Sequence, residues 1–269
     1  MKKYPDFQLF RPIQPAIRPG RDHASYRECL PSPALTSYIY CYWQLTSLPS
    51  LSEPFVYRVV ADGCIDLFFH TDHPEDVYVM GFSTTYTEFP LDHPFNYIGI
   101  RFLPAAFPLL FGVNAATLTN RFEPLGAVAP GLAAGLTQQA TGLHNLAALQ
   151  PLLDRFFEKI ATGHTADADH RLLQAVDLIL RAGGNIRLEK ELHSGVSPRQ
   201  LRRLFDFYIG DSPKTFSKVV RFQQLLHTTP TADSLKAHKH FFDAGYYDQA
   251  HFIKEFKTMY GLPPTLALP

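Results

Sequence analysis

The chain has 269 residues, of which 46% are hydrophobic and 19% are charged. This composition supplies enough apolar surface for one large or two ordinary domains and excludes a largely disordered chain. The start of the chain lacks the apolar run of a signal peptide, and no apolar stretch long enough to span a membrane is present. Cys29, Cys41 and Cys64 are isolated thiols, which is typical of a reducing compartment. We therefore expect a soluble, cytoplasmic protein that does not bind membranes.

The formal net charge of the chain is zero, but its two ends differ in charge. Residues 1–169 carry 11 Lys and Arg against 16 Asp and Glu, whereas residues 170–269 carry 14 against 9. Basic side chains displace counterions from phosphate groups, so such asymmetry is a hint of a nucleic-acid partner. A merely solvated basic surface is the alternative, and charge alone does not separate the two.

The N-terminal half is predicted to be rich in β-strands. A proline-containing lead-in of about 25 residues is expected to be irregular. Short aromatic and β-branched runs follow at 38–43, 55–60, 64–69, 77–80, 84–89 and 97–102. Turns are expected at Asp62-Gly63, His73-Pro74 and His93-Pro94. This spacing indicates a compact sheet or a barrel-like domain.

Helical periodicity begins after Pro104. Short helices are expected at 105–111 and 115–119, and a longer helix at 143–160, where Leu and Phe recur at three- and four-residue steps. The long helix either packs on its own domain or forms a dimer contact. We predict an N-terminal domain over 1–162, a polar linker over 163–170 and a helical domain over 171–269.

Two polar groups in the N-terminal half are candidate sites. The first is His70, Asp72, His73 and His93, whose spacing does not alternate as two metal ligands on one strand should, so we expect loop histidines. The second is Asp62, Asp66 and Arg101, for which we expect a structural salt bridge rather than an acid/base pair. No nucleophile motif, phosphate loop or dinucleotide fingerprint is present, so no catalytic residue, cofactor or metal ligand is predicted.

Aromatic residues gather in the first strands. They either form plain core, which is the commoner outcome, or line an apolar ligand cavity. The set is Tyr38, Tyr40, Tyr42, Trp43, Phe55 and Tyr57.

The C-terminal part follows the plan of a helix, a tight turn and a second helix with a basic outer face. A helix over 172–180 and a short helix near 186–192 precede Ser197-Pro198, which opens the next helix. There Leu201, Leu204 and Phe205 form an apolar stripe, and Arg199, Gln200, Arg202 and Arg203 lie away from it. Such a helix leaves Arg and Gln free to reach base edges in a major groove.

The same plan repeats further along the chain. Helices are expected at 213–226 and 234–242, and another begins after Asp248, a good N-cap. In this last helix Phe252 and Phe256 face the core. The predicted helix-turn-helix units thus span about 186–208 and about 234–258. The alternative for the first unit is a solvated helix in an ordinary bundle.

These residues resemble the AraC/XylS family of transcription regulators. The matching blocks are GVSPRQLRRLF at 195–205 with GDSP at 210–213, and AGYYDQAHF at 244–252 with Phe256 and GLPP at 261–264. Arg221 sits where the family usually has Arg in the helix that joins its two units. The resemblance covers about the last 85 residues. The runs VADGCIDLFF at 60–69 and GIRFLPAA at 99–106 are more weakly similar to a sensor domain found on some of these regulators.

The resemblance implies a sequence-specific transcription regulator with two recognition helices that enter successive major grooves. The implied DNA contacts are Arg199, Gln200, Arg202, Arg203, Gln249, Ala250, His251 and Lys254. Other implied partners are a small-molecule effector on the N-terminal domain, a second copy in a homodimer, and RNA polymerase if the protein activates transcription.

Two features depart from the family pattern. The helix near 188–192 lacks the usual small Ala, and Phe241 stands at a small-residue position before the second turn. Two alternatives also stay open: a metal-dependent cupin-like enzyme, and an interaction module whose helices never touch DNA. We favour a non-enzymatic α+β protein with a β-rich, barrel-like N-terminal domain, flanking helices, and an all-α C-terminal domain with two helix-turn-helix units.

Overall fold

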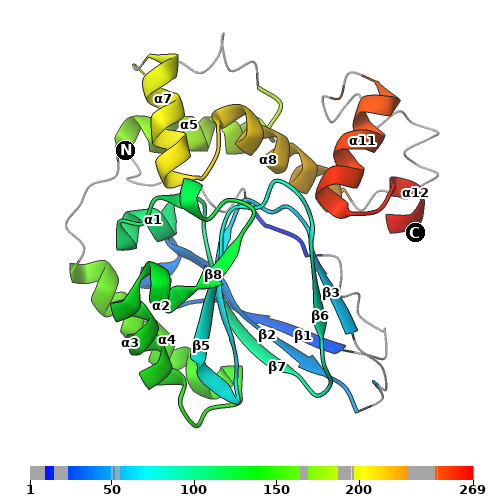
Figure 1. The fold of residues 1–269 in the computed structure, drawn as a ribbon. Coiled ribbons are helices and arrows are strands. Elements are labelled where there is room, and N and C mark those ends of the chain that lie inside the picture. Colours follow the sequence, from blue (N-terminus) through cyan, green and yellow to red (C-terminus); the bar gives the residue numbers. More distant parts are fainter. Residues whose placement is uncertain are drawn as a thin grey trace.

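The computed structural model describes residues 10–14, 24–49, 51, 55–163, 169–186, 195, 197–228, 246 and 248–268. Figure 1 shows a β-rich part, formed by the first half of the chain, with helices along one side and the C-terminal helices across one end. The predicted α+β fold, with strands in the N-terminal half and helices in the C-terminal part, is confirmed.

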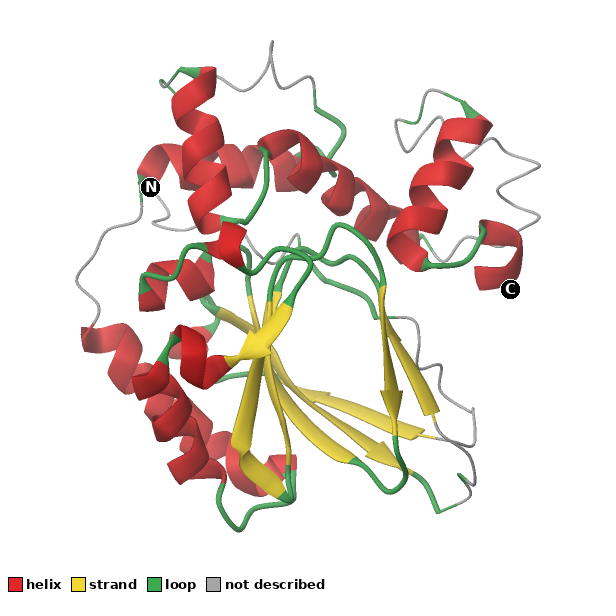
Figure 2. Ribbon diagram, viewed as in Figure 1, coloured by secondary structure: helices red, strands yellow, loops and turns green. Residues whose placement is uncertain are grey.

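Antiparallel strands form two sheets. Their bounds are β1 Ala24–Cys29, β2 Ile39–Ser47, β3 Phe55–Val59, β4 Ile65–His70, β5 His73–Met80, β6 Thr87–Leu91, β7 Asn96–Phe102 and β8 Phe122–Pro124. The large sheet has the order β1-β2-β7-β4-β5-β8, and the small sheet pairs β3 with β6. Figure 2 shows the small sheet standing across from one face of the large one.

Side chains of the large sheet alternate between its two faces, as extended backbone requires. On β7, Ile98, Ile100 and Phe102 are buried on one face, whereas Tyr97 and Arg101 lie on the face toward the small sheet. Because both faces carry large side chains, the strands appear in the sequence as nearly continuous hydrophobic runs.

Helices cover the face of the large sheet that lies away from the small sheet. Their bounds are α1 Ala106–Phe111, α2 Leu125–Val128, α3 Pro130–Ala140 and α4 Leu146–Gly163, with 3-10 helices η2 Pro33–Leu35 and η3 Ala115–Thr117. The Phe157 ring of α4 meets the Phe102 ring with centroids 5.6 Å apart. The Tyr42 hydroxyl of β2 donates to Asp154 of α4 at 2.9 Å. The apolar face predicted over 143–160 therefore packs on its own domain.

The C-terminal helices begin where the capping residues predict. Their bounds are α5 His170–Arg181, α7 Pro198–Tyr208, α8 Pro213–His227, α11 Gln249–Tyr260 and α12 Pro264–Ala267. The Ser197 side chain accepts from the Gln200 amide at 3.2 Å, and Asp248 accepts from the His251 amide at 2.7 Å. The short helices expected near 186–192 and at 234–242, with Phe241, lie largely or wholly outside the described residues. None of the described helices is long and apolar enough to cross a membrane.

The C-terminal helices pack directly on one end of the β-rich part, which the sequence did not predict. The Gln223 side chain of α8 donates to the Ala61 carbonyl at 2.7 Å and accepts from the Ile13 amide at 2.7 Å. The Ala61 amide donates to the carbonyl of Met259 in α11 at 3.2 Å. Gly63, with φ +80°, brings the chain within van der Waals reach of Phe216. Buried residues of the two parts thus form one continuous core.

Several strand and turn predictions need correction. The turn predicted at His73-Pro74 is wrong, because the chain reverses at residues 71–72 and β5 starts at His73. Proline is tolerated near the start of a strand, where its missing N–H costs no ladder bond. β1 and β8 were not predicted, and the run at 84–89 is strand from Thr87 onward. The helix expected at 115–119 is a single 3-10 turn.

Candidate nucleic-acid interface and barrel cavity

The first candidate DNA-reading helix is α7. Leu201 and Phe205 are buried beneath it, and the Phe205 ring lies 6.1 Å from the Phe216 ring of α8, centroid to centroid. The four side chains predicted to contact DNA are all exposed, namely Arg199, Gln200, Arg202 and Arg203. The apolar stripe therefore holds the helix on its neighbour and leaves the basic side chains outward, as the pattern predicts.

The structure divides these four side chains into two pairs. Gln200 and Arg203 line a surface cleft of about 570 Å³ together with Asn114, which caps η3 in the N-terminal domain. The other members of the cleft are Leu204, Asp206, Phe207 and Tyr208. Arg199 and Arg202 do not line this cleft. Part of α7 therefore borders the N-terminal domain, and no motif in the sequence indicates this contact.

The second candidate DNA-reading helix is α11. Phe252 and Phe256 are buried, with ring centroids 5.7 Å apart. The predicted DNA contacts on this helix are again exposed, namely Gln249, Ala250, His251 and Lys254. Figure 1 shows α7 and α11 on either side of α8.

Arg221 holds α11 on α8. Its guanidinium donates to Glu255 at 2.9 Å and lies 4.4 Å from the centre of the Tyr246 ring. The ammonium of Lys218 is a second cation and lies 2.8 Å from the Glu255 carboxylate. Glu255 is buried, so these cations neutralise a carboxylate that would otherwise be costly to bury. Arg221 therefore contacts other side chains of the protein, Glu255 and Tyr246.

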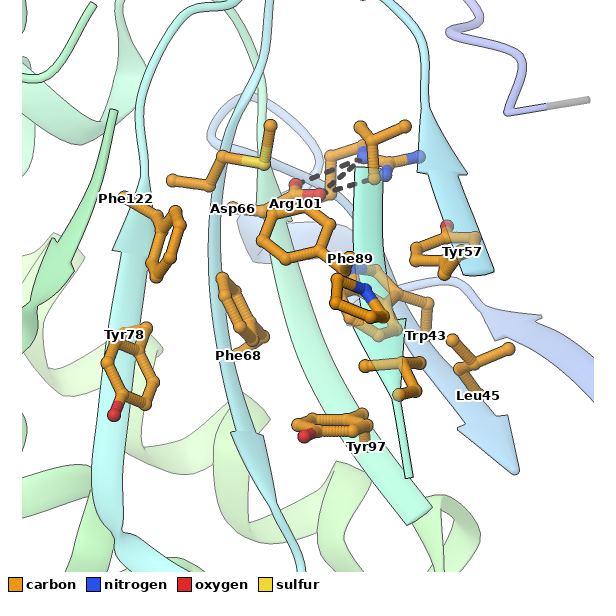
Figure 3. A pocket seen from close by; sticks show the side chains of 14 residues that line it. Trp43, Leu45, Tyr57, Asp66, Phe68, Tyr78, Phe89, Tyr97, Arg101 and Phe122 are labelled. Carbon is orange, nitrogen blue, oxygen red and sulfur yellow. Dashed lines mark hydrogen bonds and ion pairs between the residues drawn. The ribbon is translucent and has the colours of Figure 1, made fainter. Parts of the chain in front are cut away.

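A cavity of about 250 Å³ lies between the two sheets (Figure 3). The lining residues belong to strands β2 to β8, and they occupy alternate positions on most of these strands but consecutive positions on β6. They are Trp43, Leu45, Tyr57, Val59, Asp66, Phe68, Tyr78, Met80, Phe89, Pro90, Leu91, Tyr97, Arg101 and Phe122. Figure 3 shows the Asp66–Arg101 pair at one end and aromatic rings along the sides.

Gly99 makes room for the Trp43 ring on the cavity face. The two residues are directly paired between β2 and β7. A Cβ on Gly99 would lie 2.1 Å from a carbon of the Trp43 indole, closer than any real contact. The glycine is therefore required for the flat packing of the indole over β7.

The predicted cluster of Asp62, Asp66 and Arg101 is present as a structural salt bridge. Arg101 donates from Nη2 to Asp66 at 2.8 Å and from Nε to Asp66 at 3.0 Å, and its Nε lies 3.6 Å from Asp62. Burial raises the pKa of Asp66 to about 6, although the charge and hydrogen bonds of Arg101 act in the opposite direction. The cluster therefore combines two carboxylates with one guanidinium at the edge of an apolar cavity.

Of the six aromatic residues weighed as plain core or as a cavity wall, two line the cavity, namely Trp43 and Tyr57. Tyr42 points to the opposite face and bonds Asp154, and Phe55 packs on Phe95 with centroids 5.7 Å apart. The aromatic residues that sequence reasoning missed are Phe68, Tyr78, Phe89, Tyr97 and Phe122. Counting every second residue from Trp43 along each paired strand would have found most of these aromatic residues if the register between the strands had been known.

Three of the four residues weighed as metal ligands are neighbours, and the rings of His70 and His73 lie 5.9 Å apart, centroid to centroid. His70 lies 3.9 Å from Asp72, and His73 lies 3.6 Å from Glu75. Among the residues that the structure describes, no three His, Cys, Asp or Glu side chains are grouped as a metal site would require.

Comparison with known families matches two segments of the chain. Residues 27–124 match a domain of unknown function, DUF6597, and residues 193–267 match a helix-turn-helix domain. No curated protein and no solved structure gives a match. The second match supports DNA binding and transcription regulation, roles that are typically non-enzymatic. The C-terminal part of this chain is therefore similar to a helix-turn-helix domain over residues 193–267.

Proposed function

We propose that the protein is a sequence-specific transcription regulator that reads double-stranded DNA with α7 and α11 and is controlled by a small molecule bound in its N-terminal domain. The DNA-binding domain then comprises residues 171–269, behind a linker at 163–170. The observation that carries the proposal is the pair of capped helices on α8, each with a buried apolar stripe and an exposed polar face.

The proposed contacts differ between the two helices. Arg199 and Arg202 are open and suit bidentate bonds to guanine or contacts to phosphate. Arg203 and Gln200 border Asn114, so their use depends on how the N-terminal domain sits against the DNA. On α11, Gln249, His251 and Lys254 are the hydrogen-bonding groups, whereas Ala250 offers only an apolar contact. The second helix is therefore expected to bind backbone more than it reads sequence.

Selection of genomic DNA fragments by the purified full chain, repeated over a salt series, tests this function. We expect one enriched motif spanning about two helical turns, with affinity that falls as salt rises. Arg202→Ala should weaken binding to that motif by about 5- to 150-fold, which corresponds to about 1–3 kcal/mol. Arg155→Ala, an exposed residue of α4, is the matched control. Enrichment of no motif, or unchanged binding by both Arg199→Ala and Arg202→Ala, would contradict the proposal.

Control by a small molecule is supported by the position of the cavity relative to the C-terminal helices. Asp62 contacts Arg101 of the cavity wall, and its neighbour Ala61 bonds Gln223 of α8 and Met259 of α11. A change at the cavity therefore has a short route to the DNA-binding helices. The homodimer and the contact with RNA polymerase stay predictions of the family resemblance.

A further inference from the structure

We propose that the barrel cavity binds a small apolar cation, a protonated amine carried on a single aromatic or aliphatic ring, with its ammonium against Asp66. This inference rests on the proposed function in one respect only, namely that the bound amine acts as the effector. Binding of the amine is a separate claim and is tested without DNA.

The size and walls of the cavity suit one ring with a short side chain. Its volume of about 250 Å³ exceeds the roughly 150 Å³ of an apolar cavity that holds benzene. Seven of the residues that line it are aromatic, and they come from both sheets: Trp43, Tyr57, Phe68, Tyr78, Phe89, Tyr97 and Phe122. The faces of such rings carry negative electrostatic potential and attract organic cations.

The polar end of the cavity presents a carboxylate to a ligand. The side chain of Asp66 keeps 11% of its surface exposed, whereas that of Arg101 keeps 1%. Arg101 also lines the cavity and contacts Asp66 and Asp62 through Nε and Nη2, whereas its buried Nη1 makes no hydrogen bond within the described part of the chain. With both carboxylates ionised, the three residues sum to one negative charge. A cation entering the cavity neutralises that charge, whereas an anion would add to it.

Burial is the main cause of the raised pKa of Asp66. A carboxylate that accepts two or three bonds from a guanidinium ordinarily has a lowered pKa. Burial nevertheless raises the pKa of Asp66 to about 6. An ammonium group beside Asp66 would relieve this penalty.

The cavity has a side from which a ligand can enter. The rings of Phe89 in the small sheet and Phe122 in the large sheet meet with centroids 5.4 Å apart. Phe122 remains 49% exposed, so one ring of this contact faces solvent. Displacement of the Phe122 ring opens the gap between the sheets without breaking a ladder hydrogen bond between β6 and β8, because these strands belong to different sheets.

Three probes of similar shape and different charge test the proposal on the full chain. They are 2-phenylethylamine, 2-phenylethanol and phenylacetate, titrated at neutral pH by calorimetry and by fluorescence. Trp43 is the sole tryptophan of the chain and lines the cavity, so its emission reports occupancy. We expect the amine to bind roughly tenfold or more tightly than the alcohol, as a charge-assisted hydrogen bond implies, and phenylacetate to bind most weakly.

Asp66→Asn is the matched variant, because it keeps the shape of the side chain and removes its charge. It should abolish the preference for the amine over the alcohol. Preference for phenylacetate, or no change of Trp43 emission with any probe, would overturn the assignment whether or not the variant folds.

The DNA experiment separates the two proposals. Amine binding by a chain that selects no DNA motif would refute the regulator and leave the cavity assignment standing. Selection of a DNA motif by a chain that prefers phenylacetate or binds no probe would refute the cavity assignment and leave the proposed regulator standing. If the amine binds in the cavity at Trp43 and Asp66 as expected but the affinity for DNA does not change, the amine is not the effector.

Discussion

Arg221 of α8 donates a hydrogen bond to Glu255 of α11 across 2.9 Å. This bond, with the stacking of Arg221 on Tyr246 and the nearby ammonium of Lys218, joins the central helix to the second candidate recognition helix. The orientation of α11 relative to α7 is therefore governed by α8, which packs against both. Rigid placement of two helices is what successive contacts on one DNA duplex require.

Glu255→Gln should lower the free energy of unfolding by about 2 kcal/mol, because it removes the acceptor charge of two cations at a buried site. Chemical denaturation measures this change. Glu88→Gln, which breaks the more exposed pair with Arg58, should cost about 0.5 kcal/mol or less. Equal effects of the two substitutions would mean that the Arg221–Glu255 pair is no stronger than a surface contact.

Gln223→Leu should loosen the junction between the two parts of the molecule. It leaves the Ala61 carbonyl and the Ile13 amide without their partner, at a cost of about 1–3 kcal/mol. Hydrogen exchange should show faster exchange at residues 60–63 and at the end of α11. The neighbouring substitution Gln224→Leu, on the exposed side of α8, serves as control and should change stability by about 0.5 kcal/mol or less. Unaltered exchange in the first variant would show that this junction does not depend on Gln223.

Gly99→Ala should destabilise the protein by about 1–3 kcal/mol and shift the emission of Trp43, because the new methyl group overlaps the indole. Thermal denaturation and fluorescence together measure the effect. Gly126→Ala in α2, where a Cβ meets nothing within 4 Å, should be neutral or stabilise the helix by up to about 1 kcal/mol. A wild-type emission spectrum for Gly99→Ala would show that the indole does not lie over β7.

The affinity for 2-phenylethylamine should rise as the pH increases from about 5 to about 7 and then level off. Asp66 has a pKa of about 6 in the folded protein, above its ordinary value of 3.8, so it is protonated below about pH 6 and loses its attraction for a cation. The stability of the folded protein changes with pH in the opposite direction. The contribution of Asp66 to folding is complete below pH 3.8 and is lost as the pH rises through about 6.

The other ionisable groups around Asp66 are Arg101 on β7, Asp62 and Cys64 in the preceding loop, Tyr57 on β3, Cys41 on β2 and Glu28 on β1. Burial raises the pKa of Tyr57, Cys41 and Cys64, so these three groups stay neutral over this range. Calorimetric titration at several pH values measures the affinity. An Asp66→Asn variant with the same pH dependence would assign the effect to another group.

Much of the C-terminal domain was predictable because its signals are local. Ser197 and Asp248 cap helices in the structure as their positions in the sequence indicate. The apolar stripe of α7 depends only on the helical period, so the outward placement of Arg199 and Arg202 followed from spacing alone. The same local reasoning placed most strands but missed β1 and β8, which carry weak alternation at the edges of the large sheet.

The cavity was not predictable in the same way. Trp43, Phe68 and Arg101 belong to three strands, and which of their side chains share a face depends on the register between strands. A shift of one residue would turn each of them to the helix-covered face. The pairing of Gly99 with Trp43 sets where the indole lies, whereas in the sequence alone a glycine within a strand is equally compatible with a bulge or a bend.

The amino-acid sequence by itself determined the class of fold, the positions of the helix caps and the basic outer face of α7. These features depend on neighbours in the chain. Only the tertiary structure decided which aromatic rings enclose the cavity, which side of α7 borders Asn114, and that Ala61, the neighbour of Asp62, bonds α8 and α11. Such contacts connect residues far apart in the chain, and their geometry depends on how whole sheets and helices pack.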